Sequence, residues 1–191
     1  MLSRARAALS RFAARRASAL GVRAPRRAVR WLRSACSLTP TFTESFAALV
    51  ALLRSQDHRL EALSVAQDAV ARFPGHPDAW MLLGDAYQIA FKQKEALHAY
   101  EQVLVFEERA DAALAAGRLQ RRAGRPAEAA ARFARAYAAG AGPDALQENA
   151  QALFEAGDAD AAEAALNLWA TQVPDGMGRL AEARAELRKK A

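Results

Sequence analysis

Residues 80–100 read WMLLGDAYQIAFKQKEALHAY, and the spacing of large and small side chains in this stretch decides the fold. Trp80, Leu83 and Tyr87 follow one another at i, i+3 and i+7, which places them on one face of a first helix. Gly84 lies beside this apolar stripe and leaves room for a second helix to approach closely. The first half of the stretch is therefore expected to be one helix of a closely packed pair.

The second half of the stretch completes the pair. Ala96 and Tyr100 are four residues apart and supply a small and a large side chain on the face of the second helix. In type and spacing these residues resemble a tetratricopeptide repeat, a helix–turn–helix unit of about 34 residues. The resemblance implies an all-α fold, a right-handed solenoid of such units. It also implies a protein that binds other proteins.

The repeat pattern recurs on both sides at nearly the same period. A single unit cannot bury its own apolar face, so neighbours are expected. We predict four units, at 43–76, 77–109, 110–142 and 143–176. The first unit has Val50 where the repeat has glycine, and the fourth has Asn149 where leucine is usual. Two glycines occupy the same position between the helices of units three and four, where a helix end favours glycine; they are Gly124 and Gly157.

Shorter elements are expected at both ends of the array. Carried one period upstream, the pattern predicts a degenerate leading repeat helix within 25–42, with Leu32 and Ala35 packed on the first full unit. Downstream, residues 177–191 predict an amphipathic capping helix, which covers the last open apolar edge of a solenoid. Its apolar face consists of Leu180, Ala183 and Leu187.

Acidic residues recur at the second position of every unit, namely Glu44, Asp78, Asp111 and Asp144. One interpretation is an acidic row at the mouth of a binding groove. The other is a carboxylate at each helix N-terminus that caps free N–H groups and interacts favourably with the helix dipole. We favour the second interpretation, because a recurring helix start needs no ligand to explain it.

The net positive charge of the chain comes from its N-terminal part. Residues 1–43 contain ten arginines and no acidic residue, whereas the remaining 17 Lys and Arg residues of the chain face 21 Asp and Glu residues. The N-terminal part thus has a net charge of +10 and the rest has −4, although the whole chain has +6. The basic character belongs to the part that precedes the repeats.

Residues 1–24 are an amphipathic, arginine-rich and serine-containing arm, and four interpretations compete for it. These features are typical of a mitochondrial presequence, which predicts the mitochondrial matrix for a eukaryotic source and the cytoplasm otherwise. Alternatively, the arm is permanent and binds an anionic membrane surface or nucleic-acid phosphates, or it is a solvated tail. We expect neither a secretory signal, since no long apolar core follows the charges, nor a transmembrane span.

The residues that catalysis or metal binding would need are sparse. Cys36 is the one cysteine, so no disulfide within the chain is possible, and a small buried residue is the favoured interpretation. The three histidines, His58, His76 and His98, have no Cys or His at ligand spacing. We therefore predict a non-enzymatic protein with no catalytic residue, no metal ligand and no cofactor.

The resemblance also implies where a partner would bind. In tetratricopeptide repeat proteins the first helices line a concave groove, and positions 2, 5, 9, 12 and 13 of each unit face a bound peptide or helix. The polar and aromatic residues that we select from these positions are Arg54, Asp85, Gln88, Arg118, Arg121, Arg122, Gln151 and Phe154.

One part of this lining concentrates charge. Arg118, Arg121, Arg122 and Arg125 lie three or four residues apart, so they share a helix face and could hold an acidic segment through paired contacts. A solvated helix face is an equally good interpretation.

Repeat proteins that bind chaperone C-terminal tails carry lysine, asparagine and arginine at positions that are here Ala47, Ala51, Leu82, Asp111 and Ala115. A chaperone-tail adaptor is therefore not expected. The predicted function is that of an adaptor, scaffold or assembly factor with a protein or peptide partner. Nucleic acid or an anionic membrane would bind through the arm only.

Overall fold

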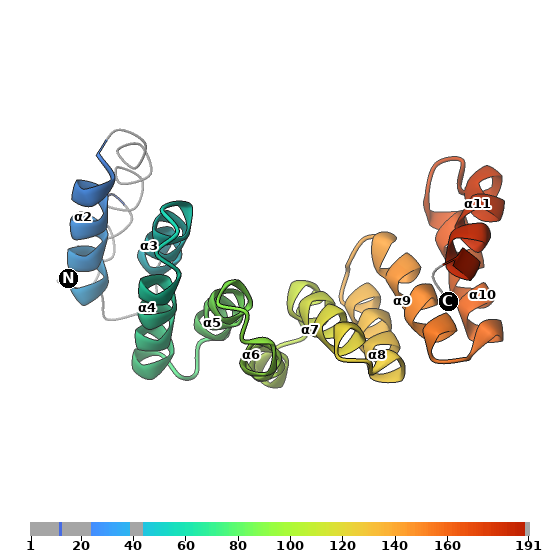
Figure 1. Ribbon diagram of the computed structural model, residues 1–191, viewed down its shortest axis with the longest axis horizontal. Coiled ribbons are helices and arrows are strands. Elements are labelled where there is room, and N and C mark those ends of the chain that lie inside the picture. The colour runs from blue at the N-terminus through green and yellow to red at the C-terminus, as the bar shows by residue number, and fades with distance from the viewer. Residues whose placement is uncertain (1–11, 13–23, 39–43, 190–191) are drawn as a thin grey trace. The chain divides into compact units, whose positions relative to one another are not determined.

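The computed structural model describes residues 24–38 and 44–189 and the single residue Phe12. Over these stretches the chain forms ten helices and no strand, and short turns join most consecutive helices (Figure 1). The chain divides into two compact units, Met1–Gln102 and Val103–Ala191, with the boundary inside one helix. No helix in the described stretches is long and apolar enough to cross a bilayer. The predicted all-α class of fold is confirmed.

The helices are 12 to 14 residues long, as expected for helix–turn–helix repeats. Those of the first unit are α2 Pro25–Leu38, α3 Glu44–Ser55, α4 Arg59–Arg72, α5 Pro77–Ile89 and most of α6 Gln93–Phe106. Those of the second unit are α7 Ala110–Arg122, α8 Pro126–Ala138, α9 Asp144–Glu155, α10 Ala159–Gln172 and α11 Gly176–Lys189.

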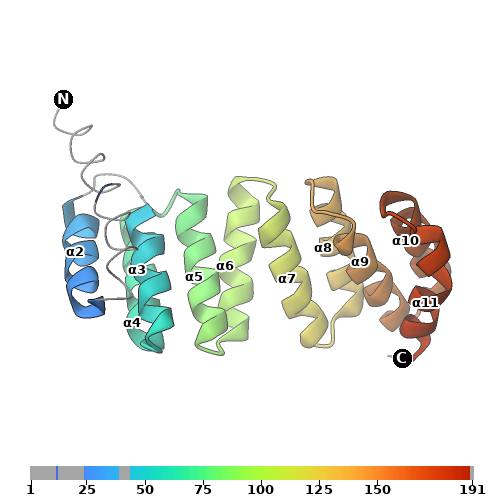
Figure 2. The same ribbon diagram turned by 90° about the horizontal axis from the view of Figure 1, so that it is seen from above.

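Within each unit, helices that follow one another in the sequence also pack against one another. In the first unit, α2 packs on α3, α3 on α4 and α4 on α5, and α3 also touches α5 (Figure 2). In the second unit the same holds from α7 through α11. The division into four repeats with the boundaries given above stays a prediction, because helix bounds alone do not define a repeat.

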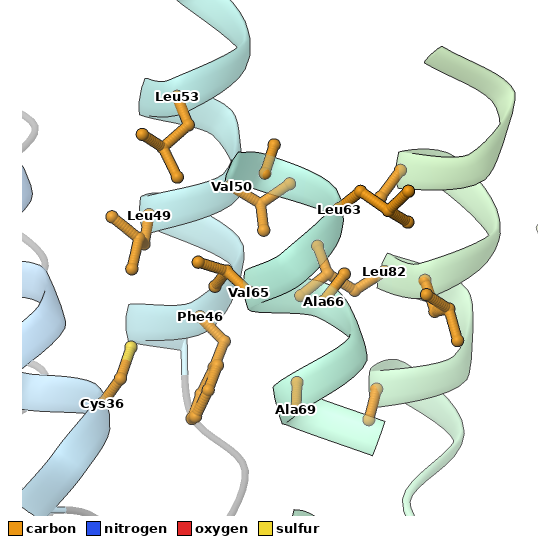
Figure 3. Close-up of a cluster of buried hydrophobic side chains, with 14 of the residues drawn as sticks. Cys36, Phe46, Leu49, Val50, Leu53, Leu63, Val65, Ala66, Ala69 and Leu82 are labelled. Carbon is orange, nitrogen blue, oxygen red and sulfur yellow. The ribbon is translucent and has the colours of Figure 1, made fainter. Parts of the chain in front are cut away.

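The core of the first unit is built from large residues of α3 and small residues of α4. Phe46, Leu49 and Leu53 of α3 are at most 2% exposed, and Ala66 and Ala69 of α4 are fully buried in the same cluster (Figure 3). The small alanines let the two helices approach, and the larger side chains fill the space between them. These side chains of α3 and α4 thus form the packed core of the first unit.

The two glycines of the first helices lie where a second helix comes closest. A Cβ atom on Gly84 would lie 2.5 Å from Cε1 of Tyr100, and one on Gly117 would lie 2.8 Å from Cε1 of Phe133. Both rings are at most 1% exposed. The expectation that Gly84 permits a close approach of the second helix is therefore correct, and the same geometry recurs in the second unit.

Helix α2 contributes to the core of the first unit. Ala28, Leu32 and Cys36 are at most 6% exposed and belong to the same cluster as Phe46. Arg72 of α4 donates a hydrogen bond of 2.6 Å to the carbonyl oxygen of Cys36. The assignment of α2 as a remnant of a further repeat stays a prediction. Apart from Phe12 and Ala24, the arm 1–24 lies outside the described residues.

In the second unit, α11 covers the apolar face of α10, as expected for a capping helix. Leu180 and Ala183 of α11 are buried in one cluster with Leu166 and Trp169 of α10. Asn149, the polar residue at a leucine position, is 7% exposed, and its Nδ2 donates a hydrogen bond of 2.7 Å to the carbonyl oxygen of Ala130. This bond satisfies the buried amide and joins α9 to α8.

The recurring acidic residues lie in the first turn of their helices, where the helix dipole favours negative charge. Among these acids, Asp111 accepts a hydrogen bond of 2.8 Å from the N–H of the next residue, Ala112. At the start of α10, Asp158 caps the helix through its side chain, which accepts from the N–H of Ala161.

Candidate functional site

Predicted groove residues of the first unit surround an open hollow. The hollow has a volume of about 670 Å³ and lies at the C-terminal ends of α3 and α5 and in the turns that follow them. Its lining consists of Ala51, Arg54, Ser55, Asp57, Arg59, Ile89 and Phe91. Four of these residues, Ala51, Arg54, Ser55 and Ile89, are at groove positions in the sequence pattern, and Arg54 is the one that was selected from the sequence.

The turns beside the hollow share one backbone geometry. After α5, the N–H of Lys92 donates to the carbonyl of Tyr87 at 2.9 Å, and Phe91 has a φ of +59°. After α3, the N–H of His58 donates to Leu53 at 2.9 Å, and Asp57 has a φ of +61°. This is the Schellman end of a helix, which needs one left-handed residue.

Among the turns of this kind that follow α3, α5, α7 and α9, the residue that takes the left-handed conformation differs. In the second unit it is glycine, with a φ of +71° at Gly124 and +88° at Gly157. Aspartate tolerates the conformation, whereas for a bulky residue such as Phe91 it is an outlier. A left-handed residue that carries a Cβ costs about 1–2 kcal/mol. Phe91 therefore occupies a position that glycine would fill with less strain.

Charged side chains frame the hollow. The guanidinium of Arg59 lies over the ring of Phe91, 5.6 Å from its centre, and Nε of Arg59 donates to Oδ1 of Asp57 at 2.6 Å. Arg54 is exposed and has no ion pair with any described residue. Since Asp57 neutralises the charge of Arg59, the net positive charge of the hollow comes from Arg54.

The other two groove residues predicted in the first unit lie outside the hollow. Asp85 is half-buried, and its Oδ1 accepts a hydrogen bond of 2.7 Å from the hydroxyl of Tyr100. This contact ties α5 to α6, so Asp85 has a structural partner. Gln88 is half-buried one turn before Phe91, and it does not line the hollow.

The arginines of α7 are paired with carboxylates of the second unit. Arg118 and Glu148 of α9 form an ion pair of 2.6 Å, and Arg121 lies 3.9 Å from the other oxygen of the same carboxylate. Arg125 is paired with Glu128 at 3.2 Å. Arg122 is exposed and makes no ion pair with a described residue. The structure thus brings Arg118 and Arg121 together, but around an internal acid that the groove positions do not include.

A smaller cavity lies next to this cluster. It has a volume of about 200 Å³ and lies between α9, α10 and α11. Its lining is Gln147, Glu148, Gln151, Leu166, Ala183, Glu186 and Leu187. The predicted residue Gln151 is therefore part of a hollow, and it donates a hydrogen bond of 3.1 Å to Glu155. Phe154 is half-buried and does not line the cavity.

Cys36 is placed as a structural residue. Its thiol is buried, and burial raises the pKa of Cys36 to about 12, so hardly any thiolate forms at neutral pH. Over the stretches that the structure describes, no three His, Cys, Asp or Glu side chains gather in a way that could hold a metal ion.

Comparison with known proteins identifies the fold. No protein-family model and no curated protein matches the sequence. Among solved structures, the chain is similar to a thermophilic tetratricopeptide repeat protein of Thermus thermophilus, with a TM-score of 0.61 and 21% identity over 90% of this chain and 99% of that one.

Two further structures show the same likeness. For PilF of Pseudomonas aeruginosa the TM-score is 0.70, with 17% identity over 89% of this chain and 79% of that one. YrrB is described as a tetratricopeptide repeat protein with an unusual peptide-binding site. Its TM-score is 0.67, with 19% identity over 89% of this chain and 88% of that one. Together with the helix pairs and the glycine contacts described above, these likenesses show that the chain has the fold of a tetratricopeptide repeat protein.

Proposed function

We propose that the chain is a non-enzymatic protein-interaction module, an adaptor, scaffold or assembly factor that binds a peptide or helix on the face of its first helices. The observation that carries this proposal is the position of the two hollows. Residues of α3 and α5 surround the first hollow, and residues of α9 border the second. The peptide-binding site named for the structurally similar YrrB agrees with such a function.

The charge around the hollows favours a partner with an acidic segment. Arg54 and Arg122 are exposed and form no ion pair with an acid in the described part of the chain, so a carboxylate of a partner can approach them directly. Arg118 and Arg121 already have Glu148, and a partner has to compete with it. An acidic partner would therefore engage Arg54 and Arg122 first.

The experiment is a pull-down with the full chain, followed by mass spectrometry. The triple variant R118A/R121A/R122A is compared with the wild type and with R135A, in which an arginine of α8 paired with Glu108 is removed. Partners that the triple variant loses and R135A keeps support binding at the α7 face. An unchanged partner list for the triple variant would refute this placement.

A second candidate function rests on the ten arginines of residues 1–43, which have no acidic residue among them. A permanent basic arm would bind RNA or an anionic membrane, and such binding weakens steeply as salt increases. Deletion of residues 1–24 discriminates between the two functions. It leaves protein partners bound if the repeats are the binding element, and it abolishes salt-sensitive RNA or vesicle binding if the arm is.

A further inference from the structure

We infer that the hollow of the first unit docks an extended peptide in which an acidic side chain stands next to a bulky apolar one. Phe91 is the apolar anchor of this site, and Arg54 holds the carboxylate. The inference rests on the proposed function and adds to it the place of binding and the chemistry of the partner.

The first argument is the energetic oddity of Phe91. Its backbone has a φ of +59°, in a turn position where the two equivalent turns of the second unit have glycine. The ring does not compensate for this strain by burial, since Phe91 is 77% exposed. Left-handed non-glycine residues concentrate at ligand contacts, where the strain serves binding. Phe91 thus destabilises the unbound protein in two independent ways, through its strained backbone and through the exposure of its ring to water. A bound apolar side chain would remove the ring from water.

The second argument is that the ring is held in place. The guanidinium of Arg59 lies 5.6 Å from the ring centre, and Asp57 holds Nε of Arg59 at 2.6 Å. Asp57 belongs to the turn after α3, whereas Phe91 belongs to the turn after α5. These contacts join the two turns and keep the ring at the rim of the hollow. An anchor that is fixed before binding loses less conformational entropy when the partner arrives.

The third argument is charge complementarity. Within the lining, Asp57 balances Arg59, which leaves the exposed guanidinium of Arg54 beside the apolar atoms of Ala51, Ile89 and Phe91. A guanidinium next to an apolar surface fits a carboxylate next to an apolar side chain. The hollow is open, so the partner's chain can continue on both sides. We therefore assign the carboxylate to an internal Asp or Glu and not to a chain end.

The probe is a library of random twelve-residue peptides displayed on phage, selected on the immobilised full chain. We expect enrichment of peptides with Asp or Glu adjacent to Leu, Ile, Phe or Met. One enriched peptide is then synthesised with both ends blocked, and its affinity is measured by isothermal titration calorimetry. The same measurement is made for the peptide with its acidic residue changed to the amide.

The variants test each residue separately. F91G should weaken binding at least tenfold without lowering the thermal midpoint of unfolding, because glycine accepts the left-handed turn. R54Q should weaken binding of the acidic peptide at least fivefold and leave binding of the amide peptide unchanged. L60A removes a side chain that is 77% exposed and outside the hollow, and it should bind like the wild type.

Several outcomes would overturn the inference. They are enrichment of no peptide, enrichment without acidic residues, or equal affinity of F91G and the wild type. Peptides that bind F91G normally but are lost in R118A/R121A/R122A would retain the proposed function and place binding at the second unit. If no peptide is enriched while the pull-down still yields partners, the proposed function stands and the peptide site does not.

Discussion

At the scale of single residues, the close approach of two helices depends on Gly84. A Cβ atom there would lie 2.5 Å from the ring of Tyr100, which is 1% exposed and tied through its hydroxyl to Asp85. Burial and the hydrogen bond of its hydroxyl both restrain the ring. The same dependence holds for Gly117 and Phe133, where the corresponding distance is 2.8 Å.

We expect G84A to lower the free energy of unfolding. Overpacking of a core lowers the free energy of unfolding by about 1–3 kcal/mol. The better helix propensity of alanine offsets at most about 1 kcal/mol of this loss. Urea unfolding followed by circular dichroism measures the difference. G75A is the control, because no atom lies within 4 Å of its added Cβ. Equal stability of G84A and the wild type would show that the ring of Tyr100 can yield.

Asp111 gives a prediction about pH. The side-chain hydrogen bonds from Arg109, at 3.0 and 2.7 Å, lower the pKa of Asp111 below its ordinary value of 3.8. Because the folded pKa lies below the unfolded one, this carboxylate stabilises the fold above the unfolded-state pKa. The contribution disappears as the pH falls from 3.8 through the folded pKa.

We expect R109A to raise the pKa of Asp111, measured by NMR titration of the carboxyl carbon. D111N should remove this part of the acid dependence of stability, so that the variant and the wild type converge in stability at low pH. A pKa of Asp111 that does not move in R109A would show that the salt bridge is not its main cause.

At the scale of elements, α2 depends on a few buried side chains. Leu32 is 1% exposed, and Cys36 lies one helical turn further on the same face. We expect L32A to cost about 2–5 kcal/mol, as the cavity left behind weakens the contact of α2 with α3. The buried thiol then becomes accessible.

The thiol of Cys36 reports this loosening, because it is the one cysteine of the chain. At pH 8 a maleimide should modify L32A much faster than the wild type, in which burial raises the pKa of Cys36 to about 12. L60A, at an exposed residue of α4, serves as the control. Equally slow modification of L32A and the wild type would mean that α2 stays in place without Leu32.

The helices could be predicted from the sequence because their apolar residues repeat at helical spacing. Trp80, Leu83 and Tyr87 indicate the stripe of α5, and Leu83 is indeed buried while the two aromatic residues pack at the edge of the core. Gln120 and Asn149 interrupt the pattern, yet both are buried with a hydrogen bond to a neighbour, which spacing alone does not reveal.

The site residues were harder to predict, because their role depends on backbone geometry and on neighbours distant in sequence. Phe91 stands at the repeat position of Gly124 and Gly157, so the comparison of equivalent turns was the available signal. Glu148 follows a groove position directly, and only the folded arrangement of α7 and α9 around α8 places it against Arg118. The position of a residue in the repeat indicates the helix face on which it lies, but not the charged side chain with which it pairs.

At the scale of the whole molecule, charge separates the arm from the repeats. The ten arginines of residues 1–43 account for the positive net charge, and the remainder is acidic. If residues 1–24 are a mitochondrial presequence, the mature protein from eukaryotic cells should start close to residue 25. N-terminal sequencing of the purified native protein measures this directly, and Met1 as the first residue would contradict cleavage.

The pairing of Arg118 with Glu148 has a consequence for how an acidic partner would be recognised at α7. Binding there is an exchange, in which an incoming carboxylate takes over a guanidinium that an internal carboxylate already holds at 2.6 Å. Salt weakens the old pair as well as the new one. The affinity should therefore fall less steeply with ionic strength than the number of arginines suggests, and E148Q should increase both the affinity and its salt dependence.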